Sequence, residues 1–145
     1  MILGFTGTRN GMTTAQKISI IEFLRLNTPE MALHGDCIGA DASFHWLLPK
    51  TTQVLIHPGG GLEHPLRAGC AASVIYPVKP FLERNHDIVN SCEHLLACPG
   101  EMTEQKRSGT WATIRYARKT GKPITIVWPD GTMTEEKHGQ TDRNV

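Results

Sequence analysis

The chain has 145 residues, of which 39% are hydrophobic and 20% charged, and its formal net charge is +1. This balance is typical of one globular domain with its own core, and it excludes a disordered or collagen-like chain. The sequence has neither a global basic excess, an apolar run approaching the ~20 residues of a membrane span, nor the start of a signal peptide. We therefore expect a cytoplasmic protein.

The spacing of cysteines and histidines predicts neither disulfides nor a metal site. The four cysteines match no CxxC pair, and a reducing compartment would keep them as thiols. The seven histidines contain neither HExxH nor the paired spacing of a zinc site. We predict no bound metal and no required cofactor. The glycine-rich segment 58–70 is either a lid or a long surface loop.

Short apolar runs alternate with helical patterns along the chain. Residues 1–6 predict a buried strand. Residues 13–26 predict a helix in which Thr13 and Gln16 form a capping box, and Ile18, Ile21 and Leu24 lie near one face. Further strands are predicted within 31–35, 52–58, 72–77, 95–97 and 122–131, and further helices within 39–48, 80–92 and 108–121.

This alternation predicts an α/β domain with a mainly parallel central sheet and helices on both faces. We expect the domain to span residues 1–130. Residues 131–145 are polar, and they predict a C-terminal extension that begins with either a short hairpin or an extended segment and ends in a loose tail.

Two predicted strands end in glycine-containing turns that suit an anion and a sugar. Ligands of parallel sheets bind outside the carboxyl ends of the strands. Gly7 permits a sharp turn, after which backbone amides and Arg9 suit a phosphate; the alternative is a tight turn with a surface arginine. In the next turn, Asp36 or Asp41 is placed to accept hydrogen bonds from ribose hydroxyls, although Asp41 suits a helix N-cap equally well.

A third loop, residues 98–111, leads from the strand at 95–97 into a helix. Ser108, Gly109 and Thr110 bring small side chains and unpaired amides to the helix N-terminus, which suits a phosphate or carboxylate. Glu101 and Glu104 are the carboxylates of this loop that could act as acid or base.

The order of "GTR", "HGDCIGAD", "ERNHDIV", "CPG" and "SGTWATIRYARKTGKPITIV" resembles a Rossmann-like superfamily, often called SLOG. It joins DNA-processing protein A, the LOG phosphoribohydrolases and small nucleotide-sensing domains. The resemblance covers the chain from Gly4 to about Pro129, and it implies a Rossmann-like three-layer domain with a crevice for nucleotide-like ligands. The matching positions are Gly35, Gly39, Asp41, Ala42, Arg84 and Asn85, with Gly109, Thr110, Thr113 and Ala117 as an approximate match.

One departure concerns activity. The phosphoribohydrolases carry a pattern resembling "PGG-GT--E", whose glutamate is needed for cleavage of the N-glycosidic bond. Here Pro99 and Gly100 are separated from Gly109 by a longer insertion, and Thr113 stands at the position of the glutamate. Glu83, Glu101 or Glu104 would have to replace that carboxylate.

We therefore predict a protein that binds a phosphorylated nucleotide-derived small molecule, as a sensor or a sequestering protein. One alternative is a nucleotide N-glycosidase that uses Glu101 or Glu104. Single-stranded nucleic acid ranks third, because only 106–122 is markedly basic, and Trp111 and Tyr116 share no helix face. The predicted ligand contacts are Gly7, Thr8, Arg9, Gly35, Asp36, Gly39, Asp41, Arg84, Asn85, Pro99, Gly100, Ser108, Gly109 and Thr110.

We expect no membrane partner. A homo-oligomer is weakly indicated, because the helix within 80–92 carries four apolar residues that could lie at an interface. Packing of most of them on the sheet is the alternative. These residues are Phe81, Leu82, Ile88 and Val89.

Overall fold

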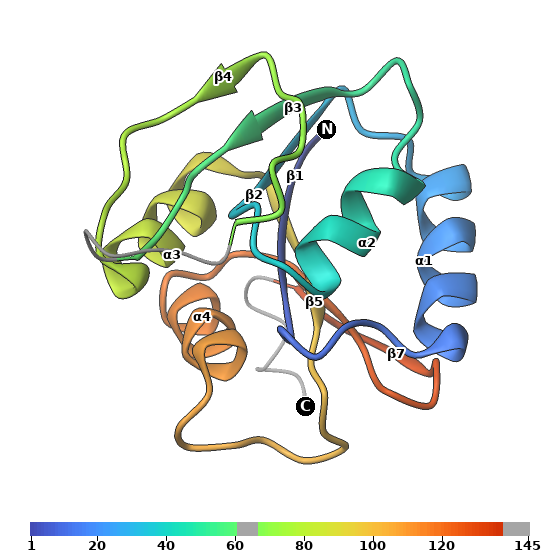
Figure 1. Ribbon diagram of the computed structural model, residues 1–145. Helices are drawn as coiled ribbons and strands as arrows, with labels where there is room; N and C mark the ends of the chain where they lie inside the picture. The colour runs from blue at the N-terminus through green and yellow to red at the C-terminus, as the bar shows by residue number, and fades with distance from the viewer. Residues whose placement is uncertain (61–66, 138–145) are drawn as a thin grey trace.

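The computed structural model describes residues 1–60 and 67–137. Within them, seven strands form one sheet in the order β4-β3-β2-β1-β5-β6-β7, and all neighbouring strands run parallel except β6 and β7. Helices α1 and α2 cover one face of the sheet, and α3 and α4 cover the other (Figure 1). The predicted α/β, Rossmann-like three-layer architecture is confirmed.

The elements follow one another in strict alternation over most of the chain. The strands are β1 Ile2–Gly7, β2 Met31–His34, β3 Gln53–Ile56, β4 Val74–Ile75, β5 His94–Cys98, β6 Ile124–Val127 and β7 Met133–Glu136. The helices are α1 Thr14–Leu26, α2 Ala40–Leu47, α3 Phe81–Ser91 and α4 Gly109–Lys119.

The order of the strands fixes where a ligand crevice can form. The chain begins in the middle of the sheet, runs outward through β2 and β3 to β4, and then returns to place β5 on the other side of β1. Loops that leave β1 and β5 therefore diverge to opposite faces, and such a switch point is where open parallel sheets bind ligands. The turns that follow β1, β2 and β5 come from three central strands of the sheet.

The core is divided by the sheet into two layers. Along β5, Leu96 and Cys98 pack with residues of α1 and α2, whereas Leu95 and Ala97 pack with residues of α3 and α4. Trp111 of α4 is fully buried in the second layer. Tyr116, which the sequence places on another face of the helix, is only partly buried.

Helix α1 begins as the sequence predicts but buries a different face. The capping box of Thr13 and Gln16 is present. Leu24 is buried, but Ile18 and Ile21, which were predicted to lie near the same face, are 64% and 50% exposed. That face is therefore not the one that packs on the sheet. The buried stripe contains Gln16, whose amide group donates to the carbonyls of Pro99 and Val127. Because one residue of the buried stripe is polar, the hydrophobic pattern alone does not identify the buried face.

The domain extends beyond the boundary predicted at residue 130. Residues Met133–Glu136 form β7, which pairs antiparallel with β6 and completes the hairpin expected in this region. Arg118 of α4 donates two hydrogen bonds to the Glu136 carboxylate, 2.8 and 2.9 Å long. Strand β7 is therefore part of the same sheet. The predicted loose tail, 138–145, lies outside the described residues.

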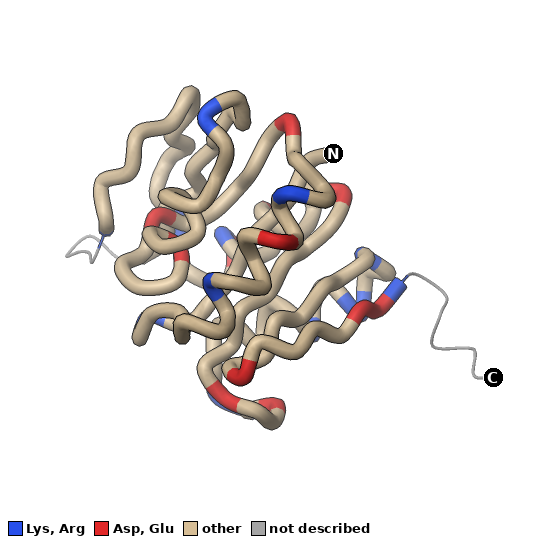
Figure 2. Tube along the Cα trace, turned by 90° about the vertical axis from the view of Figure 1, so that its right-hand side faces the viewer, with Lys and Arg blue, Asp and Glu red and all other residues tan. Residues whose placement is uncertain are grey.

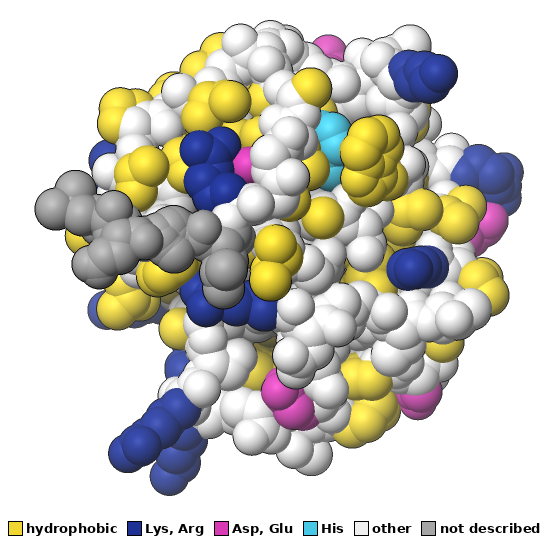
Figure 3. Space-filling model, viewed as in Figure 1, with side chains coloured by type: hydrophobic (Ala, Val, Ile, Leu, Met, Phe, Trp, Pro, Cys, Tyr) yellow, Lys and Arg dark blue, Asp and Glu magenta, His cyan; other side chains and the backbone are white. Residues whose placement is uncertain are grey.

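The four apolar residues of α3 that could lie at an interface differ in burial. Ile88 and Val89 are buried, whereas Phe81 and Leu82 are exposed. The exposed apolar side chains continue onto the β4 edge, where they gather on the face seen in Figure 3. Oligomerisation stays a prediction. No helix in the described part of the chain combines the length and apolar character that crossing a bilayer requires.

Candidate ligand-binding site

A cavity of about 380 Å³ opens at the carboxyl ends of the central strands. It is lined by most of the predicted contact residues, namely Gly7, Thr8, Arg9, Gly35, Asp41, Arg84, Asn85, Gly100, Ser108, Gly109 and Thr110. The catalytic candidate Glu101 also lines it. Segments distant in sequence therefore converge on one volume of a size typical of small-molecule sites.

The turn after β1 is held between two neighbouring elements. The Thr8 N–H donates to the Cys98 carbonyl at the end of β5, and the Thr8 carbonyl accepts from the Ala40 N–H at the start of α2. Gly7 has no space for a side chain, because a Cβ there would lie 2.6 Å from the Ala40 Cβ. The N–H groups of Asn10 and Gly11 donate to the hydroxyl and carbonyl of Thr8, so most of the backbone amides predicted to hold a phosphate after Gly7 are engaged within the protein.

Arg9 is the displaceable cation of the cavity. Its side chain is exposed and makes no hydrogen bond within the described residues, and its guanidinium lies over the Phe81 ring, 4.6 Å from the ring centroid. Gly39 positions the backbone of Arg9, because a Cβ at Gly39 would lie 2.3 Å from the Arg9 carbonyl oxygen. Gly39 does not line the cavity, so its role is indirect.

Arg84 is the fixed cation of the cavity wall. It is 6% exposed, and its Nη1 donates to the carbonyls of Gly35 at 3.3 Å and His57 at 2.9 Å, while its Nε donates to Asn85 Oδ1 at 2.7 Å. Gly35 makes this approach possible, since a Cβ there would lie 1.8 Å from Nη1. The glycine and the arginine that the family resemblance implied are thus one packed unit.

Asp41 presents a buried carboxylate to the cavity. Its Oδ2 accepts from the N–H groups of Gly35 and Cys37, each at 3.1 Å, whereas its Oδ1 accepts no hydrogen bond from the residues described. The N-cap of α2 is Gly39, so the N-cap interpretation of Asp41 is wrong. Burial raises the pKa of Asp41, while the Arg84 charge and the two amides act in the opposite direction. A ligand hydroxyl would find a free carboxylate oxygen here.

The N-terminus of α4 closes the cavity from the β5 side. Ser108 is the N-cap, and its hydroxyl accepts from the Trp111 N–H at 3.2 Å. The N–H groups of Gly109 and Thr110 donate to no residue in the described ranges, as expected for the first turn of a helix. Thr113, at the position of the expected glutamate, donates its hydroxyl to the Gly109 carbonyl.

Asp36 lies outside the cavity. Its side chain is fully buried, its backbone has a positive φ of 57°, and its carboxylate accepts from the Arg67 guanidinium and the N–H groups of Gly69 and Cys70. Burial opposes ionisation of this carboxyl, but the hydrogen bonds outweigh it and lower its pKa. Asp36 therefore anchors segment 67–70, which leaves Asp41 as the candidate for a sugar hydroxyl.

Two further predicted residues are engaged elsewhere. Pro99 does not line the cavity, and its carbonyl accepts from the Gln16 side chain. Glu104 forms ion pairs with Arg115 and Arg118, at 2.9 and 3.1 Å, on the outer side of α4. Glu101 is thus the catalytic candidate of this loop that reaches the cavity. The role of 58–70 as a lid stays untested, since residues 61–66 lie outside the described part.

Charged residues of both signs are distributed along the chain. Segments of Lys and Arg are interspersed with segments of Asp and Glu on the trace drawn in Figure 2. The basic stretch 106–122 is partly neutralised, because Arg115 and Arg118 are paired with carboxylates. Its Trp111 is fully buried and cannot stack on a nucleic acid base. Both features weigh against a track for single-stranded nucleic acid.

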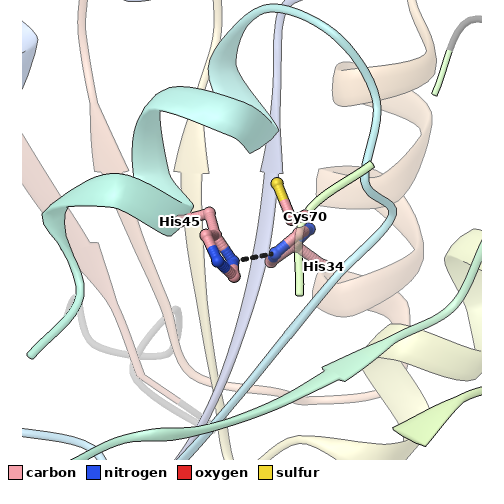
Figure 4. A group of neighbouring side chains, drawn as sticks. All are labelled: His34, His45 and Cys70. Atoms are coloured by element: carbon pink, nitrogen blue, oxygen red, sulfur yellow. Dashed lines mark hydrogen bonds between the residues drawn. The ribbon is translucent and has the colours of Figure 1, made fainter. Parts of the chain in front are cut away.

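His34, His45 and Cys70 form a cluster behind the cavity, with their ligand atoms within 4.8 Å of one another (Figure 4). His34 Nδ1 accepts from the Asp36 N–H at 2.9 Å, so the proton of a neutral His34 ring lies on Nε2 and is donated to His45 Nδ1. A neutral histidine binds a metal through an unprotonated nitrogen. In this arrangement the two histidines form a hydrogen-bonded pair, and His34 offers no lone pair to a metal.

Sequence reasoning missed five residues that line the cavity: Phe5, Thr6, Cys37, Phe81 and Ile88. Of these, Phe81 and Ile88 had a usable signal. Together with Arg84 and Asn85 they lie three or four positions apart on α3, so one helix face carries them all. The others lie on strand β1 or in the turn after β2, where residue type alone does not separate a cavity wall from the core.

Comparisons with known proteins define the fold but no family. No family model matches the chain, and no curated protein matches it. Among solved structures, the chain is similar to the molybdenum cofactor binding protein from the phototrophic bacterium Rippkaea orientalis, with 17% sequence identity and a TM-score of 0.65. The match covers 88% of this chain and 76% of that chain. At this identity the likeness shows a shared fold alone.

Proposed function

We propose that the protein binds a phosphorylated nucleotide-derived small molecule in the cavity at the strand ends, as a sensor or a sequestering protein. The observation that carries the proposal is the convergence of Arg9, Arg84 and the unpaired amides of Gly109 and Thr110 on one cavity. Helix N-termini and arginine side chains are the groups with which proteins hold phosphates.

The two ends of the cavity suit different parts of such a ligand. One phosphate would meet the first turn of α4, where Ser108, Gly109 and Thr110 line the wall, and another would meet the Arg9 guanidinium. The free Oδ1 of Asp41 would accept from a sugar hydroxyl. The similarity in fold to a protein that binds a molybdenum cofactor is compatible with a small organic ligand at this edge of the sheet.

The superfamily that the sequence resembles supports a nucleotide as the ligand, since Gly35, Asp41, Arg84 and Asn85 all line the cavity. A binding role is favoured over hydrolysis because Thr113 replaces the glutamate and its hydroxyl is engaged within α4. The enzyme alternative depends on Glu101, which lines the same cavity. It predicts a released base or a new sugar phosphate.

The first test is incubation of stoichiometric purified protein with a nucleotide panel that includes cyclic nucleotides and ADP-ribose. The free pool is then measured by chromatography before and after heat denaturation. We expect one compound to disappear and to return unchanged on heating. A free base in the pool would instead establish turnover, and Glu101→Gln would then test the catalyst. If every compound stays in the free pool, the proposal is wrong.

Arg9→Ala tests the phosphate contact. We expect roughly 10- to 100-fold weaker binding of the retained compound, because a hydrogen bond to a charged group contributes about 1.5–3 kcal/mol. The fold should stay intact, since the Arg9 side chain makes no hydrogen bond within the described residues. Arg107→Ala is the matched control, because Arg107 is an exposed cation that does not line the cavity. Undiminished affinity in Arg9→Ala would contradict the assignment.

A further inference from the structure

Phe81 presents an aromatic ring to the cavity from the first residue of α3. It is 39% exposed, although it lies beside the Arg84 guanidinium and the chain at Gly59 and Gly60. A Cβ at Gly59 would lie 2.8 Å from the ring Cδ1, so the segment after β3 passes directly against one side of the ring. The ring is thus held in place while part of its surface stays open.

Two guanidinium groups lie near this ring, and they differ in how firmly they are held. Arg84 is 5.3 Å from the ring centroid and is fixed by hydrogen bonds to Gly35, His57 and Asn85. Arg9 is 4.6 Å from the centroid and makes no hydrogen bond in the described part of the chain. Arg9 can therefore leave the ring without breaking a hydrogen bond of its side chain to the described residues.

We infer that Phe81 stacks on the base of the ligand, and that the base takes the place of the Arg9 guanidinium. This inference rests on the proposed function and names its ligand more narrowly, as a nucleotide with an aromatic base rather than a sugar phosphate. Stacking of a base on an aromatic ring strengthens ligand binding roughly 5- to 150-fold, whereas the contact of an exposed guanidinium with a ring is equivalent to a factor of only about 2 to 5. The exchange favours the base, and it frees Arg9 for the phosphate.

The cavity also holds the other groups that a nucleotide needs. Phe81 and Ile88 line it together with Arg9 and Arg84, and so do Ser108, Gly109 and Thr110 at the N-terminus of α4. An aromatic ring and anion-binding groups therefore share one cavity. Asp41 offers its free Oδ1 within the same cavity, and a sugar joins base and phosphate in any nucleotide.

The test is calorimetric titration of the full-length protein with the four common nucleoside 5'-monophosphates and with ribose 5-phosphate, which lacks only the base. We expect the wild type to bind at least one monophosphate more tightly than ribose 5-phosphate. Phe81→Leu should weaken that monophosphate about 5- to 150-fold and change ribose 5-phosphate less than about twofold. Phe81→Tyr, which keeps the six-membered aromatic ring, should retain the affinity, and Leu82→Ala is the control, because Leu82 is exposed and does not line the cavity.

Two outcomes overturn the base assignment while the phosphate site stands: equal affinity of the wild type for ribose 5-phosphate and for every monophosphate, or undiminished affinity in Phe81→Leu. If the wild type binds none of these compounds but retains another member of the nucleotide panel, stacking of a simple nucleotide on Phe81 is wrong and the proposed function stands. If nothing binds in either experiment, the proposed function fails and the base assignment fails with it.

Discussion

Single residues decide whether the cavity has its charged wall. Gly35 and Arg84 occupy one volume, because the backbone of the turn after β2 passes directly against the guanidinium. The sequence shows that a glycine stands in this turn. It does not show why a glycine is needed there, since the arginine that requires it lies 49 positions further along the chain.

Gly35→Ala should therefore lower both stability and ligand binding. The added Cβ would lie 1.8 Å from Arg84 Nη1, so the guanidinium has to move and its bonds to Gly35 and His57 are strained or lost. We expect a loss of about 1–3 kcal/mol in the free energy of unfolding, measured by chemical denaturation. Gly109→Ala is the matched stability control, because its Cβ would meet no atom within 4 Å. Equal stability of the two variants would show that Arg84 is not held as described.

His34 should make the fold sensitive to mild acid. Burial, together with the nearby His45, lowers the pKa of His34 from 6.5 to about 4, and protonation would place a second proton at Nδ1, against the Asp36 N–H. The unfolded chain takes up this proton at higher pH, so the contribution is complete above pH ~6.5 and is lost as the pH falls towards 4. It amounts to at most about 3 kcal/mol.

The measurement is the free energy of unfolding in wild type and His34→Gln at several pH values between 7 and 4. We expect the wild type to lose stability over this range more steeply than the variant does. Parallel pH profiles would mean that His34 does not carry the effect. Buried histidines that do not contact His34 titrate in both proteins and cancel in the difference, so the difference between the profiles reports on His34 and its hydrogen-bonded partner His45.

At the scale of elements, local signals were reliable and long-range ones were not. The capping box of α1 was predicted because both partners lie three residues apart, and the Ser108 start of α4 followed from the same kind of local pattern. The buried face of α1 was not, because Gln16 is buried by bonds to the ends of β5 and β6. Local chemistry fixes where an element begins, whereas its buried face depends on partners distant in sequence.

The same dependence on distant partners explains why the sequence alone does not distinguish the roles of Asp36 and Asp41. Both carboxylates follow β2 in one short turn, and the sequence offered either of them to the sugar. The positive φ of Asp36 directs its carboxylate towards segment 67–70, whereas Asp41, in the first turn of α2, lines the cavity. The choice between the two carboxylates depends on the position of segment 67–70, which comes about thirty residues later in the chain.

At the scale of the whole molecule, β7 protects the sheet. Strand β6 is apolar and buried along its whole length, and β7 covers its outer edge with exposed, mostly polar residues. Without β7, β6 would be an unpaired hydrophobic edge, which is a template for aggregation. The sequence predicts a polar C-terminal extension here because β7 lacks the apolar residues of a buried strand, and pairing with β6 makes β7 part of the sheet.

Thr134→Pro should expose that edge. Trp128 N–H donates to the Thr132 carbonyl, so by the alternation of an antiparallel ladder the pair Ile126 and Thr134 is also hydrogen-bonded, whereas Thr125 and Glu135 form a non-hydrogen-bonded pair. Proline at 134 removes a ladder donor, and we expect a loss of at least ~1 kcal/mol in unfolding free energy together with soluble aggregates in size-exclusion chromatography.

Glu135→Pro is the control for this effect, because the N–H at 135 points away from β6 and its loss leaves the ladder intact. Thr134→Val separates the backbone effect from loss of the hydroxyl that accepts from the Trp128 indole. If Thr134→Pro and Glu135→Pro are equally stable and equally monodisperse, β7 does not protect the sheet edge. A larger effect at 134 than at 135 would establish that the ladder between β6 and β7, rather than the mere presence of a polar segment, keeps the edge of the sheet covered.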